Sequence, residues 1–303
     1  MGIFTPEYFQ AKPRRKNYFE GWYFKLRAQD FCFAVIAGIT FNLEDPHAFI
    51  QTLDSSGRAA YYRYPLSEFF ASRKKLHIKI GGNIFSDNGV TLDLEGAKGA
   101  VNFSEVIYYP RSIISPNIMG PFAFLPLGCN HAVVHGSSKL SGALALGGET
   151  VIFDGGAGYC EKDYGKSFPK SWCWLHADDF SQDISIMVSA ADVSVLGVPI
   201  KGIIAFVRLG KKLYNISTYN GAKIVLDELP GRLIIKNRFY RLDILLHAGT
   251  GCILKAPGIR AKMDREITET LSAEAGIQFF RKEKILFSGV SKLTAVETVD
   301  SDR

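Results

Sequence analysis

The amino-acid sequence predicts an all-β protein built as two antiparallel barrels or sandwiches in tandem. Short apolar segments, separated by turn residues at close intervals, recur along the 303-residue chain, which is typical of meandering β-sheets. Helical periodicity is scarce. The hydrophobic fraction of 47% is sufficient for a sizeable core, and the length favours two barrels over one. We divide the chain into an N-terminal half, 1–145, and a C-terminal half, 146–303.

Turn residues give the order of the strands. Asp-Ser-Ser-Gly at 54–57 separates the apolar segment 49–53 from an aromatic run that begins at Tyr61. Asp-Asn-Gly at 87–89 precedes Val-Thr-Leu-Asp-Leu, and Asn-Gly at such a place is a strong hairpin signal. In the second half, Asn-Gly at 220–221 turns the chain into the apolar segment 222–226.

Three segments fit the strand pattern less well. Residues 65–75 and 264–275 have a composition that also allows a helix, although Thr268 and Thr270 suit a strand, because β-branched residues favour sheets. The stretch 109–128 is rich in Pro and Gly. It is expected either to connect the halves or to form part of a site between them.

Composition excludes several functional classes. The formal net charge of +6 comes from basic clusters that mostly lie beside turns. We interpret them as solvated and expect no nucleic-acid partner, while peripheral contact with an anionic membrane stays open. No run approaches the ~20 apolar residues of a membrane-spanning helix, and the start of the chain lacks the apolar core of a signal peptide. We therefore expect a cytoplasmic protein.

Sequence motifs exclude further classes. The five cysteines are scattered and form no C-x-x-C pair, so neither a disulfide framework nor a zinc ribbon is expected. No glycine motif for phosphate binding and no G-x-S-x-G motif occurs. Nucleotide binding and serine hydrolysis therefore have no support.

The densest set of chemically useful side chains lies between residues 155 and 180. Side chains alternate between the two faces of a strand, so Tyr159, Glu161 and Asp163 would share one face. An apolar wall beside a carboxyl group disfavours its charged form and raises its pKa. Such a carboxyl group could serve as an acid.

The next predicted strand places Trp172, Trp174 and His176 on one face. Indole rings there could supply the apolar wall. The alternative is structural: both carboxylates would pair with Lys162, Lys166 or Arg side chains, and the tryptophans would belong to the core. Spacing alone does not choose between these interpretations.

Four segments resemble the tocopherol cyclase family in order and spacing. The central one is GYCEKDYGKSFPKSWCWLHADDF at 158–180, and the others are NYFEGWYFK at 17–25, MGPFAFLPLGCNHAVVH at 119–135 and MDREITETLSAE at 263–274. The resemblance covers nearly the whole chain from about Tyr18. In one departure, Tyr164 stands where the family has Trp.

The resemblance implies a tandem lipocalin-like fold, shared more distantly with hydroxyneurosporene synthase (carotenoid hydratase) proteins. It also implies ring closure of a prenylated phenol to a chromanol without a metal or organic cofactor. The ligand would be a prenylquinol or another apolar isoprenoid or lipid. In this chemistry an alkene is protonated, and the phenol oxygen captures the resulting tertiary cation.

An alkene is a very weak base, so the acid must be strong or held neutral in a dry pocket. Asp163 is the preferred acid and Glu161 the other candidate. The tryptophans would stabilise the cation through their ring faces. The expected substrate-binding residues are mostly aromatic: Trp22, Tyr23, His131, Tyr159, Tyr164, Trp172, Trp174 and His176.

The histidines allow other roles. His131 and His135 stand as H-x-x-x-H, which on a helix could bind zinc. Their context is strand-like, and apart from Cys129 on the same face no third ligand has suitable spacing, so we expect no metal. His176 could hydrogen-bond a polar ligand head or act structurally.

Three functional hypotheses follow. The first is a cyclase or hydratase acting on a prenylated phenol or other isoprenoid, and acidic residues inside an aromatic-lined cavity would favour it. The second is a non-catalytic carrier, favoured if all carboxylates in the cavity pair with Lys or Arg. The third is a structural module with a filled interior.

Overall fold

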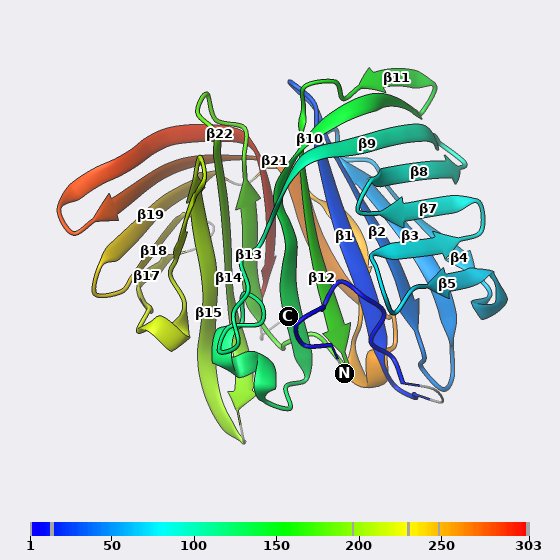
Figure 1. Ribbon diagram of the computed structural model, residues 1–303, viewed down its shortest axis with the longest axis horizontal. Coiled ribbons are helices and arrows are strands. Elements are labelled where there is room, and N and C mark those ends of the chain that lie inside the picture. Colours follow the sequence, from blue (N-terminus) through cyan, green and yellow to red (C-terminus); the bar gives the residue numbers. More distant parts are fainter. Residues whose placement is uncertain (1, 13–14, 196, 229–230, 248, 301–303) are drawn as a thin grey trace.

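The protein folds into antiparallel β-sheets (Figure 1). The computed structural model describes residues 2–12, 15–195, 197–228, 231–247 and 249–300. Within these ranges the elements are strands and short 3-10 turns, with no α-helix. The all-β prediction is therefore confirmed. The turns are η1 (Leu66–Glu68), η2 (Gly120–Phe124), η3 (Thr218–Asn220) and η4 (Ile259–Ala261).

The first sheet runs in the order β4-β3-β2-β1-β12-β10-β9-β8-β7-β6-β5, and β11 pairs with β10. Its strands are β1 (Phe19–Arg27), β2 (Cys32–Thr40), β3 (His47–Asp54), β4 (Ala59–Tyr64), β5 (Phe69–Ala71), β6 (His77–Ile80), β7 (Asn83–Ser86), β8 (Gly89–Leu94), β9 (Ala97–Tyr108), β10 (Cys129–Leu146), β11 (Glu149–Ile152) and β12 (Ala157–Gly165).

The second sheet runs in the order β16-β15-β14-β13-β22-β21-β19-β18-β17, and β20 pairs with β21. Its strands are β13 (Trp172–Ala177), β14 (Ile184–Val195), β15 (Val198–Leu209), β16 (Lys212–Asn215), β17 (Lys223–Glu228), β18 (Arg232–Lys236), β19 (Tyr240–His247), β20 (Cys252–Ala256), β21 (Arg265–Arg281) and β22 (Lys284–Val299).

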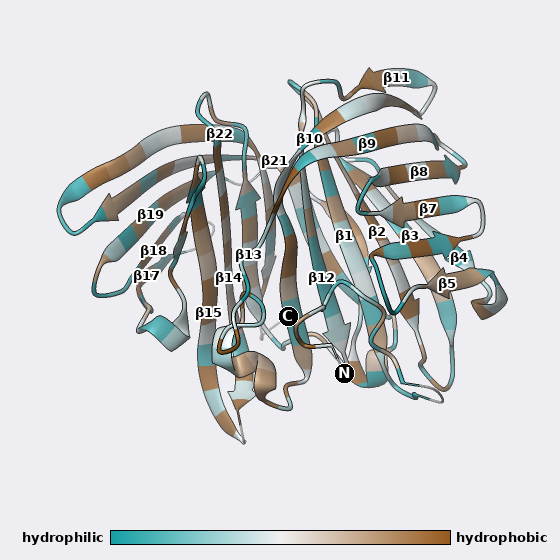
Figure 2. Ribbon diagram, viewed as in Figure 1, coloured by the Kyte–Doolittle hydropathy of each residue, from teal (hydrophilic) through white to brown (hydrophobic). Residues whose placement is uncertain are grey.

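Apolar and polar residues alternate along many of these strands (Figure 2). In β8 the side chains of Val90, Leu92 and Leu94 are buried, whereas Thr91 and Asp93 are exposed. Alternation of this kind lets one face of a sheet pack on a core while the other meets water. The apolar side chains of these strands pack into a core inside the first sheet, and those of the second sheet form a separate core.

The predicted hairpin at 87–89 is present between β7 and β8. Gly89 has a φ of 142°, and a Cβ atom there would lie 2.2 Å from the carbonyl oxygen of Val101. Only glycine fits this close approach between strands. The turn residue is therefore required by the neighbouring strand as well as by the hairpin.

The segment 264–275 forms the start of β21 rather than a helix. Every second residue from Ile267 to Ala275 is buried, which is the periodicity of a strand. In 65–75 the helical part is limited to the single 3-10 turn η1, and β5 follows it directly. The strand alternative for the first of these segments is therefore the correct one.

The chain passes from the first sheet to the second between Gly165 and Trp172. The division expected at 145/146 falls at the end of β10, and folding of two independent halves stays a prediction. The sheets are joined by buried polar contacts. Lys25 Nζ lies 3.0 Å from Asp178 Oδ1, and Arg27 Nε lies 3.2 Å from the same oxygen.

No helix among the described residues has both the length and the apolar character needed to cross a bilayer.

Candidate functional site

A pocket lies where the two sheets meet. Its cavity volume is about 170 Å³, and it is partly open to solvent. β1, β10 and β12 contribute side chains from the first sheet, and β13, β14 and β22 contribute them from the second. The stretch 109–128 adds Met119 and Phe122 and so forms part of this site.

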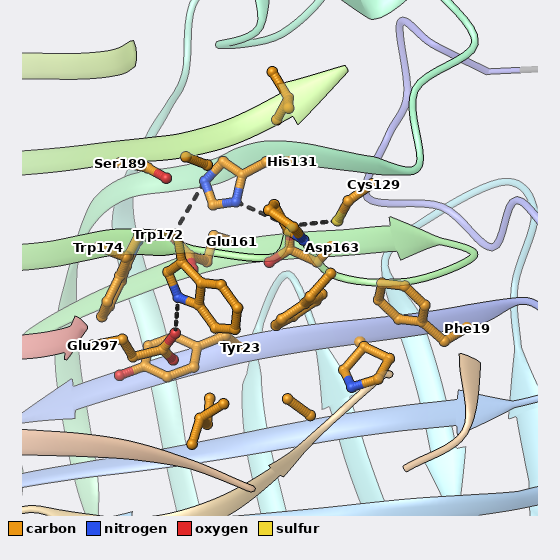
Figure 3. Close-up of a pocket in the computed structure, with 18 of the residues that line it drawn as sticks. Phe19, Tyr23, Cys129, His131, Glu161, Asp163, Trp172, Trp174, Ser189 and Glu297 are labelled. Carbon is orange, nitrogen blue, oxygen red and sulfur yellow. Dashed lines mark hydrogen bonds and ion pairs between the residues drawn. The ribbon is translucent and has the colours of Figure 1, made fainter. Parts of the chain in front are cut away.

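The pocket wall is mainly apolar and aromatic. The side chains of Trp172 and Trp174 reach it from β13, and Phe19 and Tyr23 reach it from β1 (Figure 3). Aliphatic residues of β14 and β15 and of β20 complete the wall, among them Ile200, Ile203, Ile204 and Leu254. A wall of this kind suits an apolar ligand.

Glu161 is the most deeply placed carboxyl group that lines the pocket. Its Oε2 atom accepts hydrogen bonds from the Tyr159 hydroxyl at 2.6 Å and from Trp174 Nε1 at 3.1 Å. Burial raises the pKa of Glu161 to about 7, even though the His131 charge and the Tyr159 hydrogen bond oppose the shift. Near neutral pH the group is therefore divided between its acid and its carboxylate.

His131 lies between two carboxyl groups. Its Nδ1 atom is 3.1 Å from Asp163 Oδ1 and its Nε2 atom is 3.5 Å from Glu161 Oε2. Burial lowers the pKa of His131, but Asp163 and Glu161 outweigh it and bring the pKa to about 9. The imidazole is therefore a cation at neutral pH and forms an ion pair with Asp163. Cys129 Sγ also lies 3.6 Å from Asp163 Oδ1.

These three residues are also the set that could hold a metal ion. One ligand atom from each of His131, Glu161 and Asp163 lies within 4.8 Å of the others. A metal ion would bind the neutral form of the His131 imidazole. The same trio can instead hold a proton, since the pKa of His131 is raised.

His135 does not join His131. A bulge between Val133 and His135 breaks the alternation of β10, and the His135 ring packs edge-on against Phe103 and Tyr108. The H-x-x-x-H spacing thus brings no second histidine to the pocket.

Tyr159 and His176 form a layer behind the pocket wall instead of contacting its space. Their rings stack with centroids 3.8 Å apart. His176 Nε2 lies 3.1 Å from Ser185 Oγ. Burial and the nearby Lys25 charge lower the pKa of His176 well below its ordinary value. The neutral ring supports Tyr159, which in turn positions Glu161.

Trp22 and Tyr164 were expected at the pocket, and the structure places both outside it. Their positions have the opposite parity to Tyr23 and Asp163, so the alternation of β1 and β12 turns them to the other face. There the Lys162 ammonium lies 4.3 Å from the Trp22 ring centroid and 5.0 Å from that of Tyr164. Both rings thus stabilise a buried cation of the protein itself.

That cation belongs to a fully buried ion pair. Lys162 Nζ lies 2.5 Å from Glu20 Oε2, and Glu20 also accepts hydrogen bonds from the main-chain N–H groups of Gln10 and Ala11. Lys162 therefore partners Glu20, and no lysine or arginine in the described ranges forms an ion pair with Glu161 or Asp163. The structural alternative for the two carboxylates is thus not realised.

Glu297 lines the pocket and was not predicted. Its Oε2 atom accepts a hydrogen bond from Trp172 Nε1 at 2.8 Å. Its cross-strand partner Glu269 accepts a hydrogen bond from the Tyr23 hydroxyl at 2.6 Å. Glu269 lies in the segment 263–274, one of the four segments that carry the family resemblance, so the resemblance offered a reason to consider it. No such segment includes Glu297.

Comparison with known structures shows the same fold in two proteins of low sequence identity. CghA with Sch210972 gives a TM-score of 0.62 at 11% identity, with 98% of this chain and 95% of that chain covered. Kievitone hydratase from Nectria haematococca gives 0.52 at 11% identity, with 94% and 89% covered. These likenesses confirm the tandem lipocalin-like fold.

Comparison of sequences gives a family. A search of curated proteins finds no match. The family model described as tocopherol cyclase-like matches residues 115–299, more than half of the chain. This protein therefore belongs to the tocopherol cyclase-like family.

Proposed function

We propose that this protein protonates an alkene of a prenylated phenol or a related isoprenoid and so drives ring closure or hydration. Glu161 is the acid. One observation carries the proposal: Glu161 is a buried carboxyl group on an aromatic-walled pocket, and no Lys or Arg of the described chain forms an ion pair with it. Its pKa of about 7 keeps a reactive proton available at neutral pH.

The neighbours of Glu161 supply the remaining requirements of the step. His131 stands 3.5 Å away with a proton on its cationic ring and can return one after each turnover. Asp163 holds that ring in place. The faces of Trp172 and Trp174 stabilise the tertiary cation by ~2 kcal/mol each where water is excluded. Asp163, the preferred acid from sequence, thus becomes a positioning residue in this mechanism.

Two nucleophiles can end the reaction. Capture of the cation by the phenol oxygen of the same molecule gives a chromanol, whereas capture by water gives a tertiary alcohol. The family description favours the first outcome, and one structural neighbour carries the name hydratase. Both outcomes require the same initial proton transfer and the same apolar pocket.

The second candidate function is carriage of an apolar isoprenoid or lipid without chemistry. The apolar lining of the pocket favours it. Peripheral contact with a membrane, where such ligands reside, and a cytoplasmic location belong to this proposal. The acid cluster at one wall has no role in a simple carrier.

The test is turnover of a prenylated hydroquinone in deuterated water. The wild-type protein should add one deuterium to the former alkene carbon, and Glu161→Gln should lower the rate at least about 100-fold. Glu44→Gln, at an exposed position, serves as the matched control and should keep the wild-type rate. Full turnover by Glu161→Gln would refute the proposed acid, and tight binding without deuterium incorporation by the wild-type protein would favour the carrier.

A further inference from the structure

A second acidic centre, formed by Glu269 on β21 and Glu297 on β22, reaches the pocket through Glu297. The two residues are direct cross-strand partners, so their side chains lie on the same face of the second sheet. Glu297 lines the pocket and accepts a hydrogen bond from the Trp172 indole N–H (Figure 3). Glu269 accepts a hydrogen bond from the Tyr23 hydroxyl. Neither carboxyl group is paired with a Lys or Arg side chain in the described part of the chain.

The two carboxyl groups of this pair differ in how strongly they hold a proton. Glu269 is fully buried, and its Oε2 atom has no hydrogen-bond donor among the described residues. Buried polar atoms rarely go unpaired, and two buried carboxylates repel each other. Burial raises the pKa of both carboxyl groups, and the pKa of Glu269, which the neighbouring Glu297 charge raises further, stands well above its ordinary value. Glu269 therefore holds a proton more firmly than Glu297, which lines the pocket and is the first of the two to ionise.

Trp174 connects the two acidic centres. It pairs with Glu297 across β13 and β22, while its indole N–H donates to Glu161. The hydroxyl of Tyr23 donates a hydrogen bond to Glu269. The Tyr23 ring packs edge-on against Trp174, with 5.4 Å between the ring centroids. A ligand lying along this indole therefore meets Glu161 on the first sheet and Glu297 on the second.

We propose that Glu297, backed by Glu269, binds the phenolic hydroxyl of the substrate and accepts its proton. This inference rests on the proposed function and adds the orientation of the substrate: the alkene lies at Glu161 and the hydroxyl at Glu297. During ring closure the Glu161 proton forms a C–H bond at the alkene. The phenol oxygen then forms a C–O bond with the tertiary cation, and its O–H proton passes to the Glu297 carboxylate.

The protons and bonds of this step balance. One proton enters at carbon and one leaves at oxygen, so substrate and product are isomers and no oxidant, reductant or co-reactant is needed. Glu297 ends the step protonated and Glu161 ionised. Exchange with solvent, and with His131 on the side of Glu161, restores both groups for the next turnover.

The first test measures binding and needs no turnover. The probes are a 4-alkylphenol with a saturated chain and its methyl ether, which lacks the hydroxyl proton. The wild-type protein should bind the phenol at least about tenfold more tightly, the size of a hydrogen bond to a charged group, and Glu297→Gln should bind both probes alike. Equal affinity of the wild-type protein for the two probes would overturn the inference and leave the proposed role of Glu161 intact.

The second test separates the two proton transfers. With a prenylated hydroquinone in deuterated water, Glu297→Gln should still incorporate deuterium at carbon but form little chromanol, because the cation loses a proton from a neighbouring carbon and returns to a deuterated alkene. Glu161→Gln should neither incorporate deuterium nor form chromanol. Glu297→Asp, which keeps a carboxylate at shorter reach, should retain part of the ring closure. Glu274→Gln, exposed on the same strand β21, is the matched control. Wild-type chromanol yield from folded Glu297→Gln would contradict the inference.

Discussion

The Tyr159 hydroxyl donates a hydrogen bond of 2.6 Å to Glu161 Oε2, while the Tyr159 ring stacks on the neutral His176 ring. This arrangement holds the carboxyl group of Glu161 in one orientation without a lysine or arginine. A lysine or arginine in its place would keep Glu161 ionised and remove its reactive proton. The hydroxyl instead stabilises the carboxylate only in part.

Tyr159→Phe should therefore extend activity to higher pH. Loss of the hydroxyl removes a hydrogen bond that lowers the Glu161 pKa from the value set by burial, so the pKa rises above about 7. The acid form then persists to higher pH. The measurement is the pH dependence of kcat in the variant and the wild-type protein. A midpoint that stays in place or moves down would show that another group supplies the proton.

The wild-type protein should lose activity and stability together as the pH rises. Turnover should fall as the pH passes through about 7, because Glu161 ionises there. Its folded pKa lies above the ordinary 4.5, so its contribution to the free energy of unfolding is fully present below 4.5 and is lost as the pH rises through about 7. Chemical denaturation across this range should show a decline that Glu161→Gln lacks.

Asp163→Asn should lower the pKa of His131 from about 9, because the variant loses the closest carboxylate. At a lower pKa, a smaller fraction of the His131 rings carries a proton at neutral pH, so Glu161 is reprotonated less often. We therefore expect turnover to fall about 10- to 100-fold, the effect of one charged hydrogen bond. NMR titration of the His131 ring checks the pKa, and steady-state kinetics check the rate. Complete loss of turnover with an unchanged His131 pKa would return the role of acid to Asp163.

Lys162→Met should destabilise the fold by about 3 kcal/mol, because it leaves the Glu20 carboxylate buried without its cation. The double variant Glu20→Gln/Lys162→Met should recover much of this loss. Denaturation with urea measures both free energies of unfolding. Equal destabilisation by the single and double variants would mean that the two charges do not interact.

Tyr164→Phe should leave turnover unchanged, because Tyr164 lies outside the pocket and keeps an aromatic face over Lys162. The family has Trp at this position, and either ring can stabilise the ammonium group. Kinetics with a prenylated hydroquinone test the expectation. A clear loss of kcat would place Tyr164 in the reaction after all.

The sequence was sufficient for the fold class because turns and alternating strands are local signals. Asn88-Gly89 marked its hairpin, and the parity of Tyr159, Glu161 and Asp163 placed them on one face. The same rule, applied to Trp22, would have excluded it, since Trp22 and Tyr23 cannot face the same pocket. The expectation that Trp22 lines the pocket rests on the family resemblance alone.

Other parts of the site depend on contacts between distant segments. Glu297 approaches Trp172 only because β22 pairs with β13, and no local pattern encodes that pairing. The partner of Lys162 could not be read from the sequence either, since Glu20 lies on another strand. The pairing of β1 with β12 brings Glu20 to Lys162, and Lys162 is therefore not available to Glu161.

The position of the pocket between the sheets has a consequence for how the protein unfolds. Each sheet has its own apolar core, and a third cluster joins them; we predict that an empty molecule loses one sheet before the other. A ligand in the pocket touches both walls and is released when either wall melts. Its binding free energy then adds to the free energy of unfolding of both sheets. Calorimetry should show two overlapping unfolding transitions that merge into one as the ligand concentration rises.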